Sequence, residues 1–322
     1  MRRPQPASPG VHVRAARTED LPACAEVWRA ALDGYGTRVG RPPTVAAPAP
    51  LVALLEHLRT TDGERFLVAV RPAPAGGERV VAFTSAVRRA DVWFLAMLFV
   101  HPDEQARGIG RRLLDAVLPA GDDVARRGTC TDAAQPVSNG IYARLGIVPR
   151  VPVLELVGRP DPARLPALSA GVRAVPFEAH GLGAAGDAGP RRLAAVLDAL
   201  DRGALGYAHP EDHAFLASSG RLGYVYEGAG GAPVGYGYVS AAGRVGPAAA
   251  AGEDLLPGIL GHLLGVVQPA GVFSAWVPGA AGPAVAALLE AGLRVEDFPA
   301  LLCWDRPFGD FSRYVPGTLA LL

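Results

Sequence analysis

The chain has 322 residues, half of them hydrophobic, which is long enough for two domains of ordinary size with a substantial core. Basic and acidic residues number 31 each, and this balance excludes a global field that would attract nucleic acid or an anionic membrane. The three cysteines (Cys24, Cys130 and Cys303) are too few and too scattered for a disulfide framework or a metal cluster. With no signal-peptide pattern and no apolar run near the roughly 18 residues of a membrane span, we expect a cytoplasmic protein.

The first half of the chain alternates between strand-like and helix-like segments. Short apolar runs predict strands at residues 11–15, 66–70, 80–87, 92–100, 127–131 and 151–157. Apolar residues at helical spacing predict helices after Thr18, which we expect to act as a cap, and over residues 51–58 and 136–145. A further helix is predicted after residues 101–110, with Leu113, Leu114, Val117 and Leu118 on one face. The tight connection at residues 88–91 predicts an antiparallel hairpin between its two flanking strands.

A loop with two glycines follows the strand at residues 92–100. The segment His101–Leu114 reads HPDEQARGIGRRLL, with arginines beside the glycines and a helix after them. Successive main-chain amides at Gln105–Gly110 can converge on a diphosphate, because glycine allows close approach and the start of a helix is electropositive. Arg107 and Arg111 add charged donors.

Two other phosphate-binding loops fit this segment less well. A Walker loop needs a Gly-Lys pair, and none occurs in this region. A dinucleotide fingerprint needs a third glycine, and this chain has Leu113 at that position. Its glycine loop also directly follows a strand, whereas here residues 101–107 separate the strand from the first glycine. The pyrophosphate of coenzyme A (CoA) is the remaining candidate.

Two motifs together resemble those of the GCN5-related N-acetyltransferases (GNAT family). Residues 105–110, QARGIG, match its Q/R-x-x-G-x-G/A signature, and residues 138–147, SNGIYARLGI, resemble its second motif. The resemblance covers about residues 11–157. It implies an α/β (α+β) fold with a mixed, mostly antiparallel central sheet flanked by helices. The implied reaction is direct attack of an amine on acetyl-CoA in a ternary complex, with acetyl-CoA as co-substrate and no metal.

The resemblance also implies roles for particular residues. Tyr142 would protonate the departing CoA thiolate. Asp132 is the main candidate for the base, ahead of Asp91 and His101, because the strand at residues 92–100 has no carboxylate. The cofactor would be held by Leu98, Phe99, Val100, Gln105, Ala106, Arg107, Gly108, Ile109, Gly110, Arg111 and Asn139. Trp28, Tyr35 and Trp93 could line the acceptor pocket, although aromatic residues at such positions are as often part of the core.

The second half of the chain resembles a repeat of the first. Residues 159–171, RPDPARLPALSAG, predict a linker between domains at 1–158 and 172–322. VRAVPFEAH from Val172 resembles VRAARTEDL from Val13, and the segments around Gly292 and Gly146 also match. At that offset Glu253, Asp254 and Leu256 replace Arg107, Gly108 and Gly110, and Leu288 and Val285 replace Tyr142 and Asn139. We therefore expect a degenerate second domain that does not bind CoA productively, with an aromatic C-terminal tail packed on a surface.

The leading interpretation is an enzyme that acetylates a primary amine of a small molecule. A protein or peptide N-acetyltransferase is one alternative, and a non-catalytic CoA-binding sensor or scaffold is another. We expect neither nucleic acid nor membrane as a partner, and the chain as a monomer or homodimer. The sequence does not identify the acceptor.

Overall fold

The computed structural model describes residues 10–41, 49–74, 76–120, 123–180 and 188–322. The chain folds into two compact units, unit 1 from Met1 to Ala125 and unit 2 from Arg126 to Leu322. This division precedes the predicted linker. The predicted domains at 1–158 and 172–322 describe the repeat in the sequence and stay a prediction.

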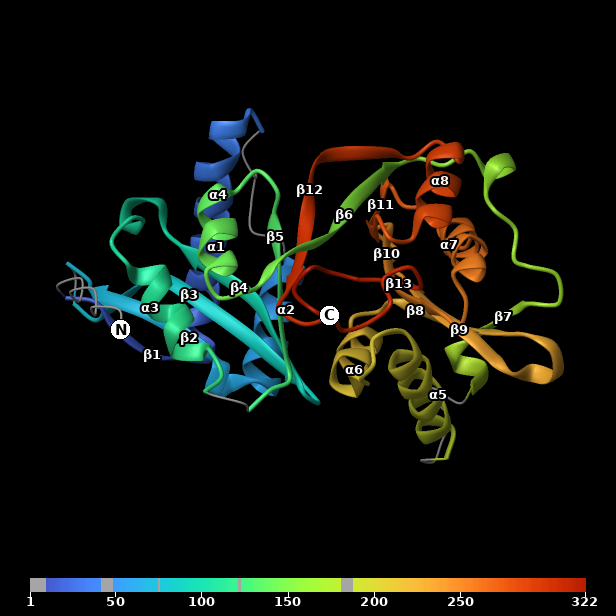
Figure 1. Ribbon diagram of the computed structural model, residues 1–322, viewed down its shortest axis with the longest axis horizontal. Helices are drawn as coiled ribbons and strands as arrows, with labels where there is room; N and C mark the ends of the chain where they lie inside the picture. The colour runs from blue at the N-terminus through green and yellow to red at the C-terminus, as the bar shows by residue number, and fades with distance from the viewer. Residues whose placement is uncertain (1–9, 42–48, 75, 121–122, 181–187) are drawn as a thin grey trace. The chain divides into compact units, whose positions relative to one another are not determined.

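Unit 1 contains an antiparallel sheet with the strand order β1-β2-β3-β4 (Figure 1). Its strands are β1 (His12–Ala15), β2 (Phe66–Pro72), β3 (Glu78–Arg89) and β4 (Val92–Val100). Its helices are α1 (Leu21–Gly36), α2 (Ala49–Thr61) and α3 (Ile109–Val117), with 3-10 turns at Thr18–Asp20, Thr37–Val39, Gly63–Arg65 and Pro102–Glu104. The predicted strands and the β3–β4 hairpin are confirmed. Thr18 was expected to cap a helix, but it begins a 3-10 turn, and α1 starts three residues later.

Helix α3 is amphipathic and buries one face against the sheet of unit 1. Ile109 and Leu113 pack with Val11, Ala69 and Val81 in one apolar cluster. The helix begins where this buried face begins, because burial of apolar area supplies most of the stability of a short helix. Figure 1 shows α3 in front of these strands and α1 and α2 behind them.

Unit 2 begins with β5 (Arg126–Asp132), α4 (Pro136–Ala143) and β6 (Val148–Gly158), which belong to the first copy of the sequence repeat. The second copy supplies β7 (Arg173–Pro176), α5 (Ala188–Ala204), α6 (Pro210–Ser218), β8 (Leu222–Glu227), β9 (Pro233–Val239), β10 (Arg244–Ala250), α7 (Leu256–Gly265), β11 (Phe273–Pro278), α8 (Gly282–Glu290), β12 (Arg294–Trp304) and β13 (Tyr314–Val315). The strand order is β5-β12-β6-β11-β10-β9-β8-β7, and β13 pairs with β10.

The order of helices and strands is the same in the two predicted copies. In the first copy it is β1, α1, α2, β2, β3, β4, α3, β5, α4, β6, and in the second it is β7, α5, α6, β8, β9, β10, α7, β11, α8, β12. The fold has a mixed, mostly antiparallel sheet arrangement with flanking helices, as predicted. The parallel pair in unit 2 is β10 with β11.

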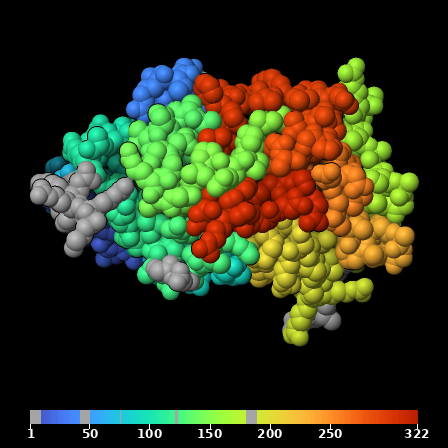
Figure 2. Space-filling view, in the orientation of Figure 1, coloured from blue at the N-terminus to red at the C-terminus, as the bar shows by residue number. Residues whose placement is uncertain are grey.

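The last strand of each copy, β6 or β12, pairs with strands of the other copy within unit 2. Strand β12 lies between β5 and β6 and is antiparallel to both, with Cys303 opposite Thr129 on β5. Strand β6 in turn pairs with β11 of the second copy, from Phe273↔Gly158 to Pro278↔Val153. In the space-filling view the red C-terminal residues lie against the green residues of β6 (Figure 2). The two copies therefore complete each other's strand pairing.

The predicted linker and the C-terminal tail are both packed against unit 2. Leu165 and Leu168 of the linker contact the core cluster formed around α7 and β10. The tail buries Phe308, Phe311 and Tyr314, which confirms that it is not a free end. The three cysteines are free thiols, as expected. None of the described helices has the length and apolar character needed to cross a membrane.

Candidate functional site

Strand β4 is irregular at the place where pantetheine was predicted to lie. Ser85 of β3 pairs with Met97, but the next residue, Ala86, pairs with Leu95, so Ala96 is an extra residue that forms a β-bulge. Beyond the bulge, Leu98–Val100 are only half-buried, whereas Val92–Leu95 are buried. The bulge therefore comes two residues before Leu98, the first of the three residues whose main chain was predicted to hold the cofactor.

The loop after β4 has a conformation suited to binding an anion. Ala106 has φ of 60° and Gly108 φ of 77°, both in the left-handed region, and Gly108 is the N-cap of α3. The amides of Ile109, Gly110 and Arg111, in the first turn, have no acceptor within the helix. A Cβ on Gly110 would lie 3.3 Å from Cγ2 of Val100, so glycine allows the helix to start close to β4. The predicted amide nest thus has the required backbone conformation.

Glu104 anchors this loop, and the sequence analysis did not single it out. Its side chain is only 6 % exposed, and its carboxylate accepts hydrogen bonds from Arg71 of β2 (3.1 Å), Arg79 of β3 (3.3 Å) and Arg107 (2.9 Å). A buried carboxylate is costly unless it is paired, so its partners hold the loop on the sheet. A lone glutamate in a loop gives no such signal in the sequence.

The predicted cofactor side chains of the loop have partners within unit 1. Arg107 donates to Glu104, and Nε of Arg111 donates to Asp115 at 2.7 and 2.8 Å. Nε2 of Gln105 donates to the carbonyl of Val100 at 3.0 Å and ties the loop to the end of β4. The roles of these three side chains toward CoA stay predictions, and the main-chain amides are the donors that the fold leaves at the helix start.

The three predicted acceptor-pocket aromatics differ in burial. Trp93 is 1 % exposed and belongs to the core, while Tyr35 is 6 % exposed with Arg41 over its ring at 5.7 Å. Trp28 is half-buried and contacts Phe99 edge-on, with ring centroids 6.4 Å apart. Trp28 is therefore the aromatic side chain with the most surface left for an acceptor, and the pocket itself stays a prediction.

Tyr142 lies on α4 in unit 2 and is 6 % exposed. Burial raises the pKa of its phenol above the ordinary value of 10, and the nearby Cys303 thiol adds to the rise, while a hydrogen bond with Ser138 opposes it. The phenol therefore carries its proton at neutral pH. This is the state that the predicted acid needs.

Asp132 and Asn139 both stabilise the turn that leads into α4. Oδ1 of Asp132 accepts from the amide of Ala134 at 2.8 Å, and Nδ2 of Asn139 donates to the carbonyls of Asp132 (3.1 Å) and Gln135 (2.9 Å). The amide oxygen of Asn139 is buried and has no hydrogen-bond partner among the described residues. The observed contacts of both side chains are structural, and their roles toward CoA and the amine stay predictions.

Arg127 positions the far end of α4. Its backbone amide and Nε both donate to Asp305 at 2.8 Å, and Nη2 donates to the carbonyl of Leu145 at 3.2 Å. One guanidinium thus ties β5 to the segment after β12 and to the end of the Tyr142 helix. Neither residue was identified from sequence, because their separation of 178 residues leaves no local pattern.

The second copy differs from the first at the two places where CoA would bind. The tail strand β13 occupies the edge of β10, with Val315 opposite Ala248 and Tyr314 opposite Ala249, and the amide of Ala250 donates to Arg313 at 2.9 Å. These three alanines precede α7 as Leu98–Val100 precede α3. The turn before α7 carries Glu253 and Asp254 in place of an arginine and a glycine.

A bulged strand, a left-handed turn and a helix start, in this order of elements, fit the arrangement expected of an acyltransferase. Comparison with known proteins shows a family match over part of the chain. The model of the acetyltransferase (GNAT) family matches residues 36–147. Residues 36–147 are thus similar to GNAT acetyltransferases, and this matched segment contains the glycine loop and the second motif.

Solved structures with similar folds are also tandem in length. A protein from Pyrococcus horikoshii, described as a candidate acetyltransferase, has a TM-score of 0.71 at 15 % identity, over 100 % of this chain and 99 % of that one. A GCN5-related N-acetyltransferase from Sphaerobacter thermophilus has a TM-score of 0.56 at 18 % identity, over 95 % and 99 %. A tandem GNAT protein from the clavulanic acid biosynthesis pathway has a TM-score of 0.55 at 17 % identity, over 92 % and 99 %. No curated protein matches the chain.

Proposed function

We propose that the protein transfers an acetyl group from acetyl-CoA to a primary amine of a small molecule. One observation carries the proposal: the left-handed turn at Ala106–Gly108, which leaves the first-turn amides of α3 as donors for a diphosphate. Residues 36–147, which match the GNAT family model, include this turn. The bulge at Ala96 supports a place for pantetheine along Leu98–Val100.

The reaction requires one acid and one route for a proton. The amine nitrogen attacks the thioester carbon, the C–S bond breaks, and the phenol of Tyr142 donates its proton to the departing thiolate. The attacking nitrogen loses a proton, which returns through solvent or Asp132 to restore the phenol. The phenol of Tyr142 is protonated at neutral pH, as this donation requires.

A small acceptor is favoured over a protein by one comparison. The tandem GNAT protein of similar fold belongs to a biosynthetic pathway for clavulanic acid, which is a small molecule. The second copy is proposed to have no CoA turnover, since β13 and two carboxylates stand where its cofactor would bind. The balanced charge supports neither nucleic acid nor an anionic membrane as a partner, and we infer a cytoplasmic enzyme.

The test combines calorimetry with CoA and a thiol-release assay with acetyl-CoA. The acceptor panel contains amino acids, amino sugars, polyamines and unstructured peptides, and mass spectrometry identifies any acetylated product. We expect one CoA per chain, and thiol release that depends on a small amine. Release with peptides alone would replace the small-molecule acceptor with a protein. Binding without release by any amine would favour a sensor, and no CoA binding would overturn the whole proposal.

A further inference from the structure

A second group of chemically active side chains lies buried in unit 2, within the second copy of the repeat. Asp201 is on α5, His209 immediately precedes α6, and His213 lies four residues later on α6. These residues are 0 %, 3 % and 6 % exposed. One ligand atom from each lies within 4.8 Å of the others. The reaction proposed above uses none of them.

The ligand atoms of both histidines lie beside one carboxylate oxygen, and that of His213 is at hydrogen-bond distance from it. Nε2 of His213 is 2.8 Å and Nε2 of His209 is 3.3 Å from the same atom, Oδ2 of Asp201. Ligands bound tetrahedrally to one zinc ion at bond lengths of about 2.0–2.2 Å stand roughly 3.3 Å from one another. The two histidine rings lie face to face, with their centroids 4.7 Å apart.

The outer atoms of the same side chains have partners that point away from this centre. Nδ1 of His213 lies 2.8 Å from the hydroxyl of Tyr238, and Nδ1 of His209 lies 3.5 Å from the carboxylate of Asp212. Oδ1 of Asp201 accepts from Tyr236 at 2.6 Å. Metal-binding histidines almost always have their other ring nitrogen engaged in this way, which fixes the tautomer with a lone pair toward the metal.

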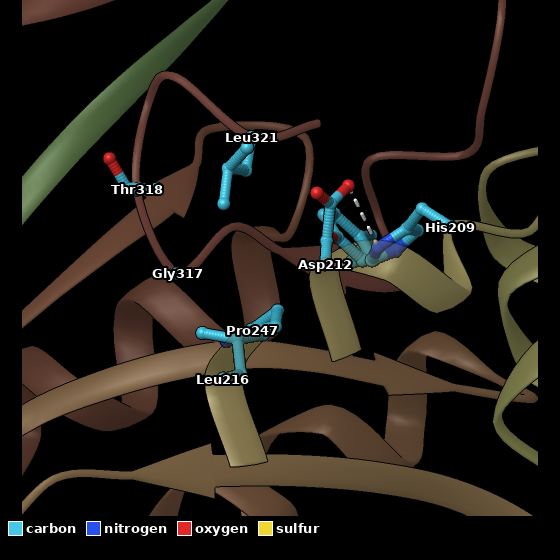
Figure 3. Close-up of a pocket in the computed structure, with 8 residues that line it drawn as sticks. His209, Asp212, Leu216, Pro247, Gly317, Thr318 and Leu321 are labelled. Atoms are coloured by element: carbon cyan, nitrogen blue, oxygen red, sulfur yellow. Dashed lines mark ion pairs between the residues drawn. The ribbon is translucent and has the colours of Figure 1, made fainter. Parts of the chain in front are cut away.

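The charge of the cluster also matches a divalent cation. Asp201 and Asp212 are 0 % and 2 % exposed, so two carboxylates are buried within one group of side chains. Buried carboxylates need neutralisation, and a dication supplies two positive charges at one point. His209 and Asp212 also line a small cavity with Pro247, Thr318 and Leu321 (Figure 3), so one edge of the cluster borders a cavity.

We propose that Asp201, His209 and His213 bind one divalent transition-metal ion, with zinc as the expected metal and water as the fourth ligand. Two imidazoles and one carboxylate suit zinc, and three protein ligands leave a position open. The ion would connect α5 with α6 across the segment between them. The site would stabilise unit 2 independently of CoA binding and turnover.

The first experiment uses the full chain, with any affinity tag removed and after treatment with a chelator. Isothermal titration with ZnCl2 should give one site per chain. The unfolding midpoint should rise by about 5–10 °C when free zinc is near 100 times its dissociation constant. Cobalt should give the intense visible bands of a four-coordinate nitrogen and oxygen site. No zinc uptake, or a cobalt spectrum dominated by thiolate charge transfer, would overturn the proposal.

Single substitutions locate the ion. His209→Gln and His213→Gln should each abolish the zinc-dependent rise in the unfolding midpoint and the cobalt bands. His262→Gln is the matched control, because His262 is partly buried beside Tyr226 and lies outside the cluster. If both cluster variants fail to fold, the metal stoichiometry of the unmodified chain still decides. Retention of the cobalt bands in a folded His209→Gln or His213→Gln variant would place the ion elsewhere and overturn the assignment.

Discussion

At the scale of single residues, burial decides what Tyr142 can do. Its phenol is 6 % exposed, and burial raises its pKa above the usual value, so the phenol remains protonated over the neutral and mildly alkaline range. The phenol is therefore already in the protonated form that can donate to a thiolate before the reaction begins. In a plot of kcat against pH, we therefore expect no loss of activity at the ordinary tyrosine pKa of about 10.

Tyr142→Phe is expected to lower kcat by about 10²–10⁴-fold, the usual contribution of a general acid. The dissociation constant of CoA should be nearly unchanged, because the main-chain amides of the loop remain. Steady-state kinetics and calorimetry on the same preparations measure the two quantities. Tyr224→Phe, a half-buried tyrosine elsewhere in unit 2, is the control. Full turnover by Tyr142→Phe would remove its role as the acid.

Gly108 carries a second prediction, through its backbone rather than a side chain. Its φ of 77° is costly for a β-branched residue, so Gly108→Val should cost about 1–3 kcal/mol or shift the loop. CoA affinity should fall by roughly 5–150-fold. Gly63→Ala is the control, since a Cβ added to Gly63 would meet no atom within 4 Å and its φ is not positive. Equal CoA affinity in Gly108→Val, measured by calorimetry, would argue against the amide nest.

At the scale of helices and strands, the pair Arg127–Asp305 holds α4 in place. Burial raises the pKa of Asp305, but hydrogen bonds from the amide and guanidinium of Arg127 outweigh it, and the pKa lies below its ordinary value. A lowered pKa in the folded state stabilises the fold above the unfolded-state value of about 3.9. That contribution is lost as the pH falls through the folded-state pKa.

Asp305→Asn should therefore lower the free energy of unfolding by about 1–3 kcal/mol at pH 7. The difference from the unmodified chain should shrink progressively below about pH 4. Urea denaturation at pH 7 and below about pH 4 measures the difference in the free energy of unfolding. Glu296→Gln removes an exposed pair with Arg294 on β12, and this control should change stability by less than about 1 kcal/mol. A difference that does not depend on pH would show that the carboxylate charge is not responsible.

At the scale of the whole molecule, the shared strands make the two sequence copies interdependent. β12 from the end of the chain separates β5 from β6, and β6 pairs with β11 of the second copy. Removal of the second copy would expose the edges of β5 and β6. Unpaired edges of this length favour aggregation.

A chain that ends at Gly158 is expected to aggregate or to remain partly unfolded, although it contains both GNAT motifs. Size-exclusion chromatography and amide hydrogen exchange provide the measurement. Co-expression with residues 159–322 should restore solubility and CoA binding, because it supplies β12 and β11 in trans. A soluble, monomeric fragment with the CoA affinity of the full chain would contradict this dependence.

The local sequence determined the elements and the chemistry of the first copy. Hydrophobic periodicity located the strands of unit 1, and two glycines with a helix start located the loop, because these features depend on neighbouring residues. The tertiary structure decided the rest: Glu104 beneath the loop, Arg127 with Asp305, the exchange of β6 and β12, and the gathering of Asp201 with His209 and His213. Each of these joins residues that no local pattern relates. Their contacts form only when burial of distant apolar segments has brought the strands and helices together.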